Sequence, residues 1–145
     1  MTPSENCIKL LKHFEGCKLD AYLDSKNIPT IGYGNTYYPD NTKVKMGDKI
    51  TQERAEELLT ILLPKYANIV NKNIKVPLTQ SQFDALVCMY WNIGHSDTLE
   101  AMINGKNPLK EIVDWWRTHY TMGLVGLVKR RDAEAYLFET GKLKI

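Results

Sequence analysis

Residues 14–34 read FEGCKLDAYLDSKNIPTIGYG, and the predicted fold depends mainly on this segment. Just before it, apolar residues recur at helical spacing, and Gly16 is a typical residue directly after a helix. Two short β-prone runs, 19–23 and 28–33, then flank a cluster of turn-forming residues. The stretch therefore predicts a helix that ends at Glu15 and leads directly into a β-hairpin.

The segments on either side of this stretch have a mostly helical pattern. At the N-terminus, Thr2, Pro3 and Glu5 form the pattern of a capping box and predict the start of the first helix. After residue 50, apolar periodicity predicts a long helix that is capped by Thr51. Pro64 should break or kink this helix, because proline lacks the backbone donor and clashes one turn back.

The second half of the chain predicts a series of helices. A capping box from Thr79 to Gln82 should start a helix that Gly94 ends. Shorter helices are expected over 97–104, 108–118 and 126–140, and the loop over 37–48 has room for one further short strand. The predicted class is α+β. We expect one domain, 1–145, with a small sheet lobe over about 15–50 and a helical part formed by 1–14 and 51–145.

The composition excludes several classes of protein. The chain has 145 residues, of which 43% are hydrophobic and 25% charged, as in an ordinary globular domain. A formal net charge of +2 is too small to indicate a nucleic-acid partner. No apolar run approaches the roughly 20 residues of a membrane span, and the N-terminus does not resemble a secretory signal. Neither a disulfide framework nor a metal site is predicted, since the three cysteines and three histidines have no matching spacing: Cys7, Cys17, Cys88, His13, His95, His119.

Glu15 stands out because of its place at the end of the predicted helix. A helix C-terminus carries partial negative charge, so an anion there is disfavoured by up to about 1 kcal/mol. Partial burial beside Phe14 would add to this effect, and both favour the protonated form that a general acid needs. A solvent-exposed glutamate that tolerates a small cost is the alternative reading of this position taken alone.

Asp24 and Thr30 are ordinary residues when each is considered singly. Aspartate commonly opens a turn, and threonine is common in strands. The hairpin, however, brings Asp24 and Thr30 close together, and the chain from Glu15 leads directly into it. Two carboxylates that flank one groove are the groups required for glycoside hydrolysis.

The order Glu15, eight residues, Asp24, five residues, Thr30 resembles the catalytic spacing of phage-type lysozymes, the endolysins of glycoside hydrolase family 24. The flanking sequence is also similar to that family from about residue 5 to 141. The matching segments are Phe14-Glu15-Gly16, Thr30-Ile31-Gly32-Tyr33-Gly34, 78–86, 91–94, and 126–131 with Glu134. Two departures occur: Asn35 stands where the family usually has histidine, and Asn27 where the hairpin often has glycine.

This resemblance implies a phage-lysozyme-like fold, with an active-site cleft between a small sheet lobe and a larger helical lobe. It implies cleavage of the β-1,4 bond between N-acetylmuramic acid and N-acetylglucosamine, without a cofactor or metal. Glu15 would be the general acid, while Asp24 and Thr30 would hold the attacking water. Family precedent favours inversion, although a nucleophilic Asp24 in a retaining enzyme stays open. By the same resemblance, Tyr33, Thr36 and Trp91 are candidates to line the saccharide groove.

The resemblance also implies partners and a location. We expect a monomer that acts on peptidoglycan glycan strands, binds no nucleic acid and does not insert stably into membranes. It would be made in the host cytoplasm without a signal peptide and would reach the cell wall after release through a holin, causing lysis of the host. Two alternatives within the fold are a non-catalytic cell-wall-binding domain and a lytic transglycosylase. A nucleic-acid binder is disfavoured by the small charge excess over 110–145, seven basic against five acidic residues.

Overall fold

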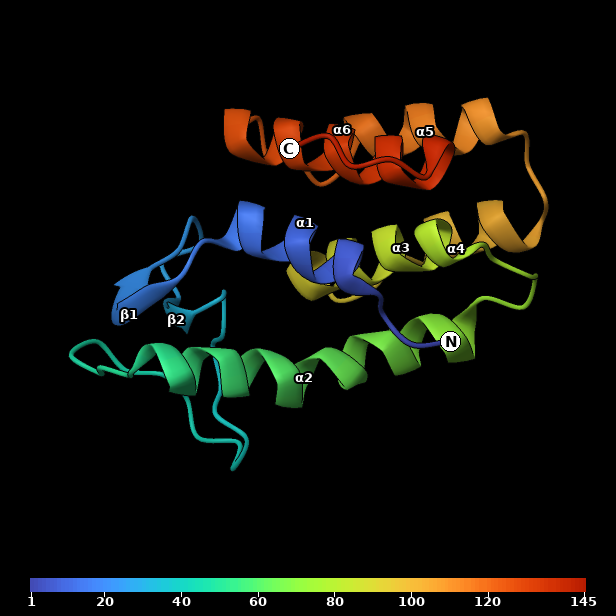
Figure 1. Ribbon diagram of the computed structural model, residues 1–145. Helices are drawn as coiled ribbons and strands as arrows, with labels where there is room; N and C mark the ends of the chain where they lie inside the picture. Colours follow the sequence, from blue (N-terminus) through green and yellow to red (C-terminus); the bar gives the residue numbers. More distant parts are fainter. The chain divides into compact units, whose positions relative to one another are not determined.

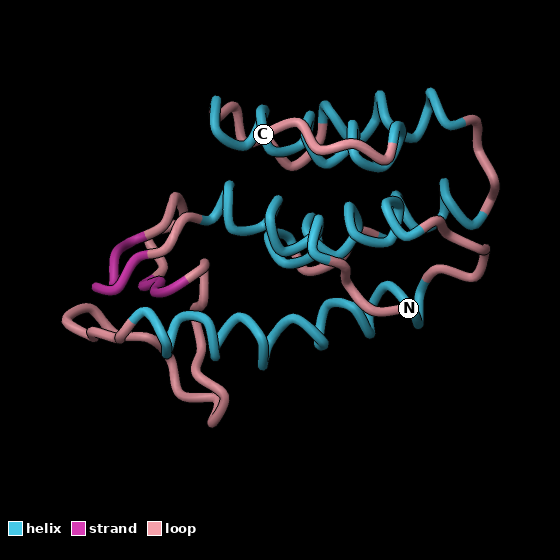
Figure 2. The backbone as a smooth tube through the Cα atoms, in the orientation of Figure 1, coloured by secondary structure: helices cyan, strands magenta, loops and turns pink.

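The computed structural model describes residues 1–145 and has six helices and one β-hairpin (Figure 1). Their bounds are α1 Glu5–Glu15, β1 Lys18–Leu23, β2 Pro29–Gly32, α2 Gln52–Asn73, α3 Gln80–Ile93, α4 Asp97–Asn104, α5 Leu109–Thr118 and α6 Val125–Thr140. The predicted α+β class is confirmed, with a single two-stranded antiparallel sheet among helices (Figure 2). No helix combines the length and the apolar character that crossing a membrane requires.

The chain divides into two compact units. One unit consists of residues 11–64, and the other consists of residues 1–10 together with residues 65–145. We call them the hairpin unit and the helical unit. Helices α1 and α2 each contribute residues to both units.

The hairpin unit is organised by the pairing of β1 with β2. Tyr22 pairs with Thr30 and Leu23 pairs with Pro29, whereas the register is irregular between Lys18 and Tyr22. The long loop that follows β2 returns to the other edge of β1, where the Ile50 amide donates to the Leu19 carbonyl at 2.8 Å. This returning segment forms only isolated bridges, so the further short strand that the loop could hold is not a full element.

The helical unit has α3 as its central helix. The predicted capping box is confirmed, since Thr79 and Gln82 exchange side-chain and backbone hydrogen bonds, and the helix ends at Gly94 as expected. Every residue from Phe83 to Trp91 is buried, which indicates that all sides of this helix are covered. Helix α6 packs against α3 and α5, and α4 packs against α5.

A buried ion cluster joins α3, α5 and α6. The fully buried Glu134 carboxylate accepts from Trp116 Nε1 at 3.2 Å and pairs with Arg130 Nε at 2.9 Å and Arg131 Nε at 3.0 Å. Arg130 also donates to the Cys88 carbonyl at 2.8 Å, and Arg131 donates to Asn92 Oδ1 at 2.7 Å. These bonds hold α6 against α3 and α5.

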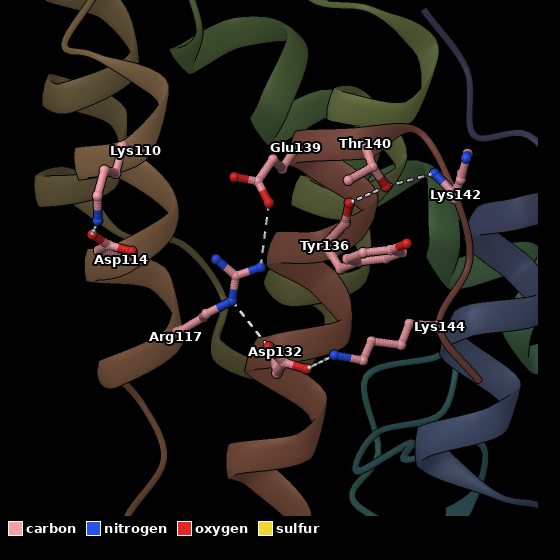
Figure 3. Close-up of polar contacts among 9 residues, drawn as sticks. All are labelled: Lys110, Asp114, Arg117, Asp132, Tyr136, Glu139, Thr140, Lys142 and Lys144. Atoms are coloured by element: carbon pink, nitrogen blue, oxygen red, sulfur yellow. Dashed lines mark hydrogen bonds and ion pairs between the residues drawn. The ribbon is translucent and has the colours of Figure 1, made fainter.

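A second set of ion pairs lies between α5, α6 and the C-terminal segment (Figure 3). Asp132 accepts from Arg117 Nε at 2.9 Å and from Lys144 Nζ at 2.8 Å. These partners, Lys144 first and then Arg117, hold the pKa of Asp132 below its usual value. This cluster is partly exposed, unlike the Glu134 cluster.

One sequence prediction about a helix end was wrong. The first helix begins at Glu5 rather than near Pro3, because the Ser4 amide and hydroxyl both bond to Asp84 and fix the chain there (the amide at 2.9 Å). Pro64 does not divide α2, which runs from Gln52 to Asn73. The Thr51 cap of that helix is confirmed, since its hydroxyl accepts from the Arg54 amide at 3.1 Å.

Candidate active site

Glu15 is the last residue of α1, as the sequence predicts. The chain turns immediately afterwards at Gly16, whose φ of +62° is easily adopted only by glycine. The carboxylate of Glu15 lies directly against Gly34, which follows β2 and has a φ of +83°. A β-carbon at Gly34 would fall 2.8 Å from Glu15 Cδ, so no larger residue fits there without moving the carboxylate.

Asp24 forms the turn between β1 and β2. Its Oδ1 accepts from the amides of Lys26 at 2.8 Å and Ile28 at 2.9 Å, while its own backbone amide donates to the Ile28 carbonyl at 3.1 Å. Asn27 adopts a φ of +61°, the left-handed conformation that asparagine tolerates better than most residues. The turn therefore holds one carboxylate oxygen in place and fixes the orientation of the side chain.

Thr30 lies at the start of β2, opposite Tyr22. It is only 3% exposed, and its hydroxyl donates to the Ile28 carbonyl at 2.8 Å. Because Ile28 also donates to Asp24, these bonds place Thr30 and Asp24 at the same end of the hairpin.

The pKa of the Tyr22 phenol on β1 is affected by both carboxylates. Burial raises the pKa of the Tyr22 phenol, and the negative charges of Glu15 and Asp24 raise it further. Tyr22 is also the partner of Thr30 in the strand pair. Sequence reasoning did not single out Tyr22 or Gly34 as parts of the site.

The three residues that are predicted to contact the saccharide lie in different surroundings. Tyr33 is 6% exposed, and its hydroxyl accepts from Gln52 Nε2 at 3.1 Å. Burial and hydrogen bonding to Glu56 raise the pKa of Tyr33 to about 12. Thr36 is partly exposed in the loop after β2, and its carbonyl accepts from the Val44 amide.

Trp91 belongs to the helical unit, near the end of α3. It is 8% exposed and its ring contacts that of Tyr66, with 5.4 Å between the centroids. A sugar-binding role for Trp91, Tyr33 or Thr36 stays a prediction.

Asn35, which replaces the usual histidine, is buried in the hairpin unit. Its backbone pairs with Ile31 in both directions at 2.9 Å. Its side chain is different, because neither Nδ2 nor Oδ1 has a hydrogen-bond partner although the residue is 2% exposed. No group of three or more His, Cys, Asp or Glu side chains is arranged to hold a metal ion.

Comparison with known proteins assigns the family. The sequence model described as Phage lysozyme matches residues 12–134. The endolysin of Acyrthosiphon pisum secondary endosymbiont phage 1 is 36% identical over 147 residues, covering 94% of this chain and 97% of that protein. The endolysin of Bacillus phage B103 is 39% identical over 152 residues; these cover 99% of this chain but only 56% of that longer protein.

Solved structures agree with the sequence comparison. The endolysin from Escherichia coli O157:H7 phage FAHEc1 superposes with a TM-score of 0.84 at 39% identity, covering 100% of this chain and 98% of that one. The chain therefore belongs to the phage lysozyme family, which confirms the resemblance found in the sequence and makes it a glycoside hydrolase of the lysozyme type.

Proposed function

We propose that the chain is a muramidase that cleaves the β-1,4 bond between N-acetylmuramic acid and N-acetylglucosamine in peptidoglycan. The observation that carries this proposal is that the Glu15 carboxylate lies against Gly34, just after β2, while Asp24 and Thr30 both bond to the backbone of Ile28 in the same hairpin. It supports a single site with two carboxylates and a hydroxyl group. Such a pair of carboxylates is what glycosidic bond cleavage requires.

In the proposed mechanism, the protonated Glu15 donates its proton to the leaving glycosidic oxygen. Asp24 accepts a hydrogen bond from the attacking water and takes up its proton as the water oxygen bonds to the anomeric carbon and the glycosidic bond breaks. The turn amides occupy Oδ1 of Asp24, so Oδ2 is the oxygen that we assign to the water. Thr30 helps to position the same water, which attacks the face opposite the leaving group and inverts the anomeric centre.

The first test is removal of the proposed acid. Glu15→Gln keeps the size of the side chain but has no proton to donate, so we expect clearing of purified peptidoglycan to fall by about 10²- to 10⁴-fold. Glu5→Gln is the matched control, because Glu5 is an exposed glutamate in the first turn of the same helix. Clearing by Glu15→Gln at the wild-type rate would remove Glu15 from the mechanism.

The second test identifies the products. Mass spectrometry of digested peptidoglycan should show new reducing muramic acid ends, whereas anhydro-muramic ends would identify a lytic transglycosylase. Tight binding to the wall without any new ends would identify a non-catalytic binding domain. NMR of the first-formed anomer distinguishes inversion from retention by a nucleophilic Asp24.

We further propose that the enzyme works as a monomer and reaches the cell wall after release through a holin. Membership of an endolysin family supports action on the wall and host lysis. Expression in a host with and without a holin gene tests the release step, because lysis should require both genes. Sedimentation of the purified chain tests the monomer.

A further inference from the structure

The pairing of β1 with β2 ends just before the two chain segments reach the proposed acid. Lys18 and Gly32 form the last pair at this end of the hairpin. Cys17 and Tyr33 are the next residues on the two segments. Both lie within two positions of the contact between the proposed acid and Gly34. A bond between these segments, outside the strand pairing, therefore affects how the acid is held.

The side chain of Gln52 joins these two segments. Its Nε2 donates to the Tyr33 hydroxyl at 3.1 Å, and its Oε1 accepts from Cys17 Sγ at 3.4 Å. Gln52 is the first residue of α2, directly after the Thr51 cap, so the start of a helix fixes its position. A side-chain amide carries a donor and an acceptor on one planar group, and it can therefore hold both segments at once.

A second contact from the same side of α2 reaches α1. Residues four apart lie on one face of a helix, and Glu56 follows Gln52 at this spacing. The Glu56 carboxylate pairs with Lys12 Nζ at 2.5 Å, and the same Nζ lies 5.3 Å from the centroid of the Tyr33 ring. Lys12 lies in the last turn of α1, which ends at Glu15. One face of α2 therefore contacts both segments that meet at the proposed acid.

We propose that Gln52 is a positioning residue for Glu15, whose amide holds the segment after Glu15 and the segment before Gly34 together beyond the end of the strand pairing. The inference rests on the muramidase mechanism proposed above. Glu15 already lies in close contact with Gly34, so a separation of the two segments would move the acid relative to the hairpin that carries Asp24. Reaction rates fall steeply with such displacements.

Gln52→Met tests this role, because it keeps an unbranched side chain of similar length and a good helix former but removes the amide. On soluble peptidoglycan fragments we expect kcat to fall about tenfold and KM to change by less than about twofold, since positioning acts on the reacting groups more than on substrate binding. The melting temperature should change little, because Gln52 is exposed. A raised KM with unchanged kcat would show that Gln52 contacts substrate instead and would overturn the inference.

Glu53→Met is the matched control. Glu53 is the exposed neighbour of Gln52 in the first turn of α2 and receives the same new side chain. We expect this variant to keep the wild-type kcat. Equal kcat values for Gln52→Met and Glu53→Met would contradict the proposed role.

The partners of Gln52 show whether its effect passes through them. Cys17→Ala combined with Tyr33→Phe removes both bonds and leaves Gln52 in place, so kcat should fall by a similar factor. Adding Gln52→Met to this double variant should cause no further loss, because residues that act through one contact are not additive. A further tenfold loss would overturn the inference. Should Gln52→Met fold poorly, the double variant alone decides, since a wild-type kcat in it would also overturn the inference.

The outcomes separate this inference from the proposed function. If Glu15→Gln clears peptidoglycan at the wild-type rate, the proposed mechanism and the role of Gln52 both fail. If Glu15→Gln is inactive and Gln52→Met behaves as wild type, only the role of Gln52 fails.

Discussion

The Glu15 carboxylate occupies the space that a side chain at Gly34 would take, although 19 positions separate the two residues in the chain (34 − 15). Helix α1 and the segment after β2 therefore meet at one carboxyl group. Because Gly34 has no β-carbon, it leaves room for the carboxylate of the proposed acid.

Gly34→Ala should sharply reduce activity. The added methyl group would displace the Glu15 carboxylate, and a misplacement of about 1 Å at a reacting group can lower the rate about 10²-fold. Gly47→Ala is the control, because Gly47 has a similar φ of +97° but nothing within 4 Å of its β-carbon position. Both variants bear the same kind of backbone strain, so a rate loss only in Gly34→Ala would locate the effect at Glu15. Equal clearing rates would show that the carboxylate tolerates displacement.

Asp24→Asn should keep the turn and lose the activity. The amide oxygen can still accept from Lys26 and Ile28, which leaves the NH2 group at the position of Oδ2. A hydrogen-bond acceptor thus becomes a donor, so we expect clearing to fall about 10²-fold or more while the melting temperature changes little. Asp40→Asn, at a turn where Asp40 Oδ1 likewise accepts from the amide two residues on, should stay active. Similar rates for both variants would contradict the assignment of Asp24.

Asn35→Leu should maintain or increase the free energy of unfolding. The buried amide has no hydrogen-bond partner, and an unsatisfied buried polar group costs about 1–3 kcal/mol. Urea denaturation measures the change. Asn35→Asp serves for comparison, because it places an unpaired charge at the same site and should destabilise the chain strongly. A loss of stability in Asn35→Leu would indicate that a buried water molecule satisfies the amide.

Asp132→Asn should destabilise the chain at pH 7 and have no effect in strong acid. Lys144 and Arg117 lower the pKa of Asp132 in the folded chain, so its contribution is complete above the unfolded pKa of about 3.9. It is lost as the pH falls through the lower folded value. Because the pair is partly exposed, we expect only about 0.5–1 kcal/mol at pH 7. Thermal unfolding of both proteins from pH 7 to pH 2 should give curves that converge, and a constant difference would exclude this ion pair as the cause.

The sequence predicted those features that depend on neighbouring residues. The Thr79 capping box and the end of α3 at Gly94 involve contacts within a few residues, and both are confirmed. The start of α1 was wrong because Ser4 bonds to Asp84, which is 80 residues away in the chain. Pro64 lies inside α2, which continues to Asn73, so the missing backbone donor does not end the helix.

The candidate site was predicted only in part, for a similar reason. The spacing of Glu15, Asp24 and Thr30 is local to one helix–hairpin segment and could be compared with a family. The contact of Gly34 with Glu15 and the charges acting on Tyr22 depend on how the strands pair. The isolated amide of Asn35 is equally a property of packing, since asparagine in a sequence does not reveal whether a partner lies within reach.

The Glu134 cluster has a consequence for how the helical unit assembles. If α6 docked one turn out of register, Glu134 would lose Trp116 on α5, and Arg130 and Arg131 would lose their α3 acceptors, the Cys88 carbonyl and Asn92. A buried polar group left without its partner costs about 1–3 kcal/mol, and more when it is charged. We therefore expect the cluster to favour a single alignment of the helices. We expect apolar replacement of the three charged residues to leave a compact unit with alternative dockings of α6, visible as a second indole NMR signal from Trp116.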